Sequence, residues 1–118
     1  MKRIWYLSTC STCSRIIKEL GDTSSFEMID IKQWGILRSD LDDLVALLRG
    51  TYDDFFSKRA MKYRAMGLQL KQLSQEEMAE LITSEYTFLK RPVIQIGNKV
   101  FVGNSKKVVA AAIEINGQ

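Results

Sequence analysis

Residues 2–31 are patterned as a strand, a helix and a second strand in succession, and this pattern constrains the fold most strongly. Apolar and aromatic residues cluster over 2–7, which predicts a short buried strand. Apolar residues spaced by three and four over 11–20 predict a helix, and alternating residues over 26–31 predict a second strand. Such a unit usually forms a parallel pair of strands with a right-handed crossover.

The middle of the chain is helical in pattern. Apolar spacing predicts a helix that is capped by Ser39 and ends at Gly50, followed by one or two shorter helices within 52–66. Ser74 and Glu77 have the spacing of a capping box, so a further helix is expected to begin there.

A β-hairpin and a final helix are predicted for the end of the chain. Pro92, the only proline, precedes two apolar runs at 93–96 and 99–102 that a Gly-Asn turn separates. Asn104 is predicted to cap the last helix. Periodicity alone therefore supports an α/β or α+β sandwich.

Composition limits the class of protein. A chain of 118 residues with 46% apolar residues can build one compact core without metals or multiple disulfides. A net charge of +3 is too low for a dedicated nucleic-acid binder and suits small anionic substrates better. The N-terminal apolar run is too short for a signal peptide or a membrane span, so we expect a cytoplasmic protein, and most simply a monomer.

Chemistry is concentrated in two cysteines, Cys10 and Cys13, at the first strand–helix junction. The backbone N–H groups and the dipole at a helix start favour a thiolate on Cys10, which makes it the expected nucleophile. Cys13 lies one turn further in, where it can resolve a mixed disulfide. The hydroxyls of Ser11 and Thr12 can donate to the thiolate or to a bound oxyanion. The chain has no histidine, so Cys/His and Ser/His/Asp catalysis are excluded.

Two alternatives for the cysteines stay open at this stage. Cys13 fits the apolar face of its helix and can be a small core residue, although Cys10 fits that face poorly. A zinc site needs four ligands, and this chain has only two cysteines and no histidine. The cysteines could therefore bind zinc only if two molecules shared the ion. We therefore expect no metal.

Three motifs together resemble the arsenate reductase family, which also contains the Spx transcriptional regulators. They are the cysteine motif after the first strand, Tyr63-Arg64-Ala65-Met66-Gly67-Leu68, and Arg91-Pro92-Val93-Ile94 before the hairpin. The resemblance implies one thioredoxin-like α/β domain over 1–118, with a mixed four-stranded sheet and a helical insertion at about 38–88. It also implies that the Pro92 peptide is cis and packs opposite Cys10.

The resemblance further implies an arsenate reductase-like thiol-disulfide oxidoreductase, in which Cys10 attacks arsenate or a disulfide. Arg91 is the leading contact for the oxyanion, because a guanidinium offers a planar, permanently charged fork. Arg15 and Arg59 are further candidates, although Ser14 stands where many relatives have an arginine and both can be solvated surface residues. No bound cofactor is implied; glutathione with glutaredoxin, or thioredoxin, would supply electrons.

The Cys-x-x-Cys pair also suits the Spx-like branch of this resemblance. There the protein would be a redox-sensing regulator that binds RNA polymerase, with a Cys10–Cys13 disulfide as its switch. Exposed basic residues near Lys58 and Arg64 form a local patch, for which an ordinary solvated helix face is the commoner explanation. Catalytic turnover separates the enzyme from the regulator.

Overall fold

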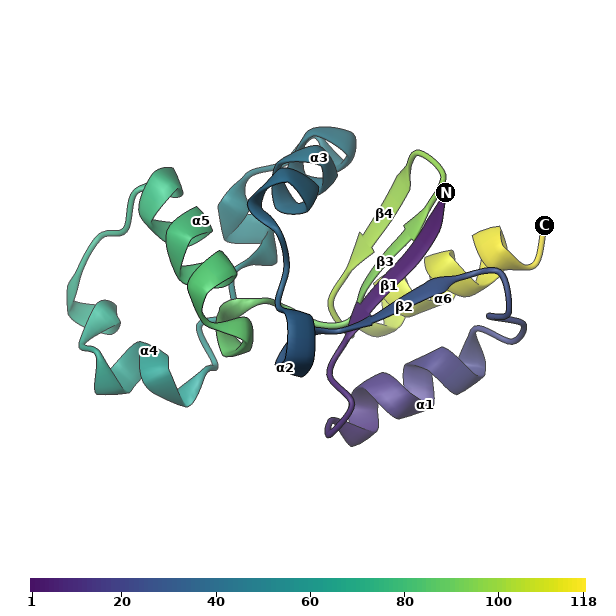
Figure 1. Ribbon diagram of the computed structural model, residues 1–118, viewed down its shortest axis with the longest axis horizontal. Helices are drawn as coiled ribbons and strands as arrows, with labels where there is room; N and C mark the ends of the chain where they lie inside the picture. The colour runs from purple at the N-terminus through teal and green to yellow at the C-terminus, as the bar shows by residue number, and fades with distance from the viewer. The chain divides into compact units, whose positions relative to one another are not determined.

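A computed structural model describes residues 1–118 and divides them into two compact units (Figure 1). Residues 1–34 and 91–118 form the unit that contains the sheet, and residues 35–90 form a helical unit. The insertion predicted at about 38–88 lies inside the second range. None of the helices is long and apolar enough to span a membrane.

The sheet has four strands in the order β2-β1-β3-β4. Strand β1 (Lys2–Tyr6) pairs in parallel with β2 (Glu27–Asp30) and antiparallel with β3 (Val93–Ile96), which pairs antiparallel with β4 (Lys99–Val102). The predicted α/β class and the mixed four-stranded sheet are therefore confirmed. This strand order is that of a thioredoxin-like fold.

Two helices cover the same face of this sheet, as Figure 1 shows. They are α1 (Ser11–Glu19), which leads from β1 toward β2, and α6 (Lys106–Asn116), which follows β4. Their apolar faces meet the strands in one core, which comprises Ile4, Ile16, Leu20, Phe26, Ile94, Val109 and Ala112. The burial of α1 against this core holds its N-terminus at the end of β1.

Short helices make up the other unit. In chain order they are α3 (Arg38–Leu48), η1 (Tyr52–Phe55), α4 (Met61–Ala65), η2 (Leu68–Leu70), α5 (Gln75–Ser84) and η3 (Tyr86–Phe88). The predicted capping box is confirmed: the Glu77 N–H donates to Ser74 Oγ at 3.1 Å, and the Ser74 N–H donates to Glu77 Oε1 at 3.0 Å.

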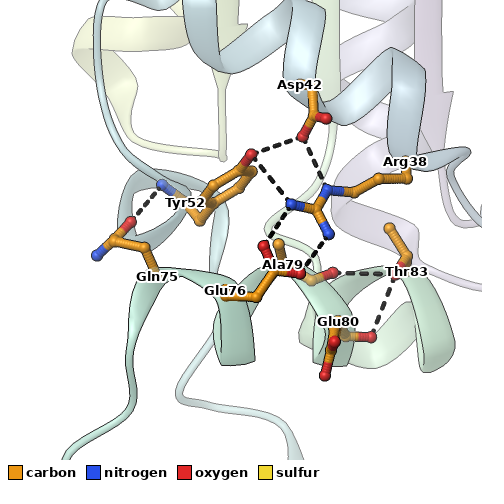
Figure 2. A network of polar contacts seen from close by, with 8 residues as sticks. All are labelled: Arg38, Asp42, Tyr52, Gln75, Glu76, Ala79, Glu80 and Thr83. Atoms are coloured by element: carbon orange, nitrogen blue, oxygen red, sulfur yellow. Dashed lines mark hydrogen bonds and ion pairs between the residues drawn. The ribbon is translucent and has the colours of Figure 1, made fainter.

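A network around Arg38 links three of these helices (Figure 2). The guanidinium donates to both oxygens of Glu76 at 2.8 Å and to Asp42 Oδ1 at 2.9 Å. The Tyr52 hydroxyl donates to the same Asp42 oxygen at 2.6 Å, and Gln75 Oε1 accepts from the Tyr52 N–H at 2.9 Å. Helices α3, η1 and α5 are therefore tied together by polar contacts.

Three predicted boundaries were wrong. The helix expected from Ser39 begins at Arg38, with Leu37 as its N-cap. It ends before Gly50, because Arg49 is the C-cap and has a positive φ angle. The last helix is capped by Ser105, whose Oγ accepts from the Val108 N–H at 3.3 Å, and not by Asn104.

The strand predicted over 26–31 is also shorter than expected. It ends at Asp30, because Ile31 begins a short helix, α2 (Ile31–Trp34). Asp30 Oδ1 accepts a hydrogen bond from the Lys32 N–H at 3.2 Å, which favours a helical turn over further extension.

Candidate active site

Cys10 occupies the N-cap position of α1, at the end of the turn that leaves β1. Its N–H donates to the Leu7 carbonyl at 3.0 Å, which closes the turn. Its carbonyl accepts the first helical hydrogen bond from the Ser14 N–H at 3.2 Å. The backbone on both sides of Cys10 is thus fixed, and its half-exposed thiol lies at the positive end of the helix dipole.

The surroundings of Cys10 lower its pKa. Burial alone would raise it, but the N–H and thiol of Cys13, the N–H of Thr12 and the charge of Arg91 together outweigh burial. The Cys10 side chain makes no capping hydrogen bond of standard geometry, so these N–H groups act chiefly through their proximity to the sulfur. The result favours the thiolate, which is the nucleophilic form of cysteine.

Cys13 differs from Cys10 in burial and in acidity. It is fully buried on the inner face of α1, and burial raises the pKa of its thiol to about 11. The negative charge on Cys10 raises this pKa further, against the lowering effect of the Leu7 backbone. At neutral pH the pair therefore holds one thiol that ionises readily and one that keeps its proton.

Arg91 and Pro92 precede β3, and the pairing of Trp5 with Val93 brings them beside the end of β1. The Arg91–Pro92 peptide is cis, as the sequence resemblance implied. Pro92 is buried, and Arg91 is half-buried. The charge of Arg91 lowers the pKa of both cysteines, so Arg91, Cys10 and Cys13 are brought together by the fold.

The other predicted anion contacts differ in their local surroundings. Ser11 is exposed and Thr12 is half-buried in the first turn of α1, directly after Cys10. Arg15 is exposed on the same helix and pairs with Glu19, one turn further from Cys10, at 3.1 Å. Arg59 lies in the helical unit, exposed before α4. A contact between Arg59 and an anion stays a prediction.

Asp30 was not among the predicted site residues. Its Oδ1 accepts from the Ser8 N–H at 3.3 Å, and the parallel register sets Asp30 beside Tyr6 at the end of β1. The Ser8 side chain, together with the Ser8 and Lys32 backbones, lowers the Asp30 pKa despite slight burial. An acidic residue at the end of an alternating strand was the signal that could have revealed it.

The fold and this cysteine pair define a thioredoxin-like protein with its thiols at the start of the first helix. More narrowly, the chain belongs to the ArsC family, whose model matches residues 5–112. Among known proteins, it is similar to the uncharacterized protein YusI of Bacillus subtilis (strain 168). The two are 31% identical over 102 residues, which cover 84% of this chain and 86% of YusI.

Solved structures show the same fold. The crystal structure of a possible arsenate reductase from Streptococcus mutans UA159 matches with a TM-score of 0.72 and 30% identity, over 90% of this chain and 92% of that chain. An ArsC family related protein from Bacteroides fragilis matches with a TM-score of 0.79, over 94% and 96% of the two chains. At 20% identity, the second match shows the fold alone.

Proposed function

We propose that this protein is a thiol-dependent reductase of the arsenate reductase type, with Cys10 as the nucleophile and Cys13 as the resolving thiol. The observation that carries the proposal is the placement of the two thiols: Cys10 is half-exposed at the N-cap of α1, and Cys13 is buried one turn further in. The directions of the pKa shifts, lowered for Cys10 and raised for Cys13, agree with this placement. Membership of the ArsC family and the likeness to a possible arsenate reductase support it.

With arsenate, the Cys10 thiolate attacks arsenic(V), and an oxygen leaves as water after protonation. Cys13 then loses its proton and attacks the Cys10 sulfur. The S–As bond breaks, its electron pair stays on arsenic, and arsenite leaves as arsenic(III). Two thiols are thus oxidised to one Cys10–Cys13 disulfide, which an external thiol reductant must return to the dithiol.

With a disulfide substrate, the same two thiols act in the same order. Cys10 attacks one sulfur and releases the other as a thiolate, and Cys13 then displaces the second half from Cys10. Once Cys10 is bonded, its negative charge no longer raises the pKa of Cys13. Deprotonation of Cys13 therefore becomes easier at the stage that needs it.

Arg91 is proposed as the anion contact of this site. Its charge already acts on Cys10, and a guanidinium can hold two oxygens of a tetrahedral oxyanion in a bidentate contact. Ser11 and Thr12 add hydroxyls and backbone N–H groups at the same helix start. With a glutathione mixed disulfide as substrate, the positive charge of Arg91 would pair with a carboxylate of the glutathione.

The deciding experiment is NADPH-coupled turnover of arsenate, and in parallel of a glutathione mixed disulfide. Each is supplied with glutathione and glutaredoxin, or with thioredoxin and thioredoxin reductase. Cys10→Ser is expected to abolish turnover, and Cys13→Ser to stop at a mixed adduct or to depend on added glutathione. Lys107→Ala, which removes an exposed charge on α6, serves as the control. Full turnover by Cys10→Ser would refute the mechanism.

The regulator remains the second candidate, because a reversible Cys10–Cys13 disulfide would equally serve as a switch. It predicts no turnover with either substrate, together with reversible disulfide formation and binding of purified RNA polymerase in one redox state. Turnover that depends on Cys10, without polymerase binding in either redox state, excludes it.

A further inference from the structure

Residues 59–71 of the helical unit, here called the α4 surface, expose an unusual amount of apolar side chain. Met61 is 90% exposed, Leu70 is 85% exposed and Met66 is 53% exposed. Single exposed apolar residues are ordinary, but three within one short segment form a cluster. Helix α4 and the turn η2 contact each other, so the cluster belongs to one local structure.

The α4 surface is also strongly basic. No acidic residue occurs from position 55 to position 75. Lys58 pairs with Asp53 at 3.9 Å, and Lys62 pairs with Glu85. Arg59 and Arg64 are exposed and make no ion pair, so their charges are left for another molecule. Lys71 is exposed too, and its charge acts on Glu77 without forming an ion pair.

Internal packing anchors this segment, so the exposure does not come from a loose loop. The Tyr63 ring meets the buried Phe56 ring edge-on, with centroids 6.0 Å apart, and Leu68 is buried. The ion pair of Lys62 with Glu85 adds a polar anchor to the end of α5. The exposed apolar and basic side chains therefore project from a fixed backbone, which lowers the entropy cost of binding.

We propose that the α4 surface is a docking site for an acidic protein segment that also carries aliphatic or aromatic side chains. The exposed Arg59, Arg64 and Lys71 complement acidic groups, and Met61, Met66 and Leu70 supply apolar contact. Methionine is suited to such a role because its flexible side chain adapts to the partner.

A protein partner fits this surface better than a single-stranded nucleic acid does. Nucleic-acid surfaces combine cations with aromatic rings on which bases stack. The one aromatic residue here, Tyr63, is half-buried and packs on Phe56. Exposed Met and Leu side chains instead match the apolar side chains of a peptide. Arg59 is also a predicted anion contact, but the other residues of this surface have no part in the proposed thiol chemistry, so the inference goes beyond the proposed function.

Fluorescence anisotropy with the full chain tests the proposal. The probes are a labelled peptide of Glu, Asp, Leu and Phe, a second in which Ser replaces Leu and Phe, and oligo(dT). The first peptide is expected to bind most tightly and to weaken as salt is added. Arg59→Glu with Arg64→Glu should weaken it about tenfold or more, because attractive charges become repulsive. Met61→Ser with Leu70→Ser should weaken it to a similar degree.

Matched controls distinguish binding at this surface from non-specific electrostatic or hydrophobic binding elsewhere on the protein. Lys106→Glu with Lys107→Glu changes two exposed lysines of α6, and Trp34→Ser removes a residue that is 74% exposed on α2. Both controls should bind the first peptide as the parent does, and so should Cys10→Ser. Equal binding of the two peptides, tighter binding of oligo(dT), or equal losses in the control variants would each overturn the proposal.

Discussion

The carboxylate of Asp30, at the end of β2, accepts a hydrogen bond from the backbone N–H of Ser8, in the turn after β1. This contact joins the ends of two parallel strands directly before the reactive cysteine. The same oxygen also accepts a hydrogen bond from the Lys32 N–H, in the first turn of α2. Asp30 thus fixes the turn that carries Cys10, although it does not touch the sulfur itself.

Asp30→Ala is expected to lower the free energy of unfolding by about 1 kcal/mol, because two backbone N–H groups lose a charged acceptor. It should also slow alkylation of Cys10. Asp30→Asn keeps an accepting oxygen and should retain most of both properties. Urea unfolding and iodoacetamide kinetics measure the two effects. Equal behaviour of Ala and Asn would show that Asp30 does not position the turn.

The lowered pKa of Asp30 gives this contribution a definite pH dependence. The stabilisation is fully present above the ordinary carboxyl pKa of about 3.9, and it is lost as the pH falls through the lowered value in the folded protein. The stability difference between the parent and Asp30→Ala should therefore shrink on acidification below about pH 4. A constant difference would contradict the assignment.

The alkylation rate of Cys10 as a function of pH tests the charge of Arg91. In a Cys13→Ser background, the rate should reach half its maximum at a lower pH than for an unperturbed cysteine, since thiolate forms as the pH rises through a lowered pKa. Arg91→Ala should move this midpoint upward, and Arg91→Lys should move it less. Arg15→Ala, which changes a surface arginine paired with Glu19, should leave it in place.

Local patterns predicted the parts of the fold that depend on local chemistry. The helix over 11–20, the hairpin after Pro92 and the Ser74–Glu77 capping box are all present, because spacing and capping determine them. The cysteine pair was found for the same reason, since a nucleophile at a helix start is visible in sequence. The proximity of the cysteine pair to Arg91 depends on the pairing between β1 and β3. Only the family resemblance indicated this proximity.

The boundaries that were wrong depend on choices between neighbouring residues. Asn104 and Ser105 both suit a cap, and nothing in the sequence favours the serine that the helix uses. Arg38 belongs to α3, where its side chain can reach both Asp42 and Glu76. An N-cap stabilises a helix by only about 1 kcal/mol, so the contacts of Arg38 can outweigh a cap at Ser39 and make the helix begin one residue earlier.

Substitution of two serines tests this interpretation of the caps. Ser74→Ala should lower the free energy of unfolding by about 1 kcal/mol, because the Glu77 N–H loses its acceptor. Ser39→Ala should cost nothing, or stabilise by up to about 0.5 kcal/mol, because Ser39 lies inside α3 and alanine favours helix. Chemical denaturation measures both. A larger loss for Ser39→Ala would restore it as the cap of that helix.

The Arg38 network is expected to control the stability of the helical unit. Its guanidinium bonds both oxygens of Glu76 and one of Asp42. The Tyr52 hydroxyl and then Arg38 lower the pKa of Asp42, and Arg38 lowers the pKa of Glu76. The stabilisation should therefore be present above the ordinary carboxyl pKa and be lost as the pH falls through the lowered values.

Arg38→Lys keeps the charge but removes the planar fork, so it cannot reproduce the bidentate contact with Glu76. Hydrogen exchange should then become faster for the amides of α3 and α5, while β1 and β3 keep their protection. Arg64→Lys changes an exposed arginine without an ion pair and is the matched control. Equal exchange in the two variants would mean that apolar packing alone joins α3 to α5; faster exchange only in Arg38→Lys would make this network the tie between them.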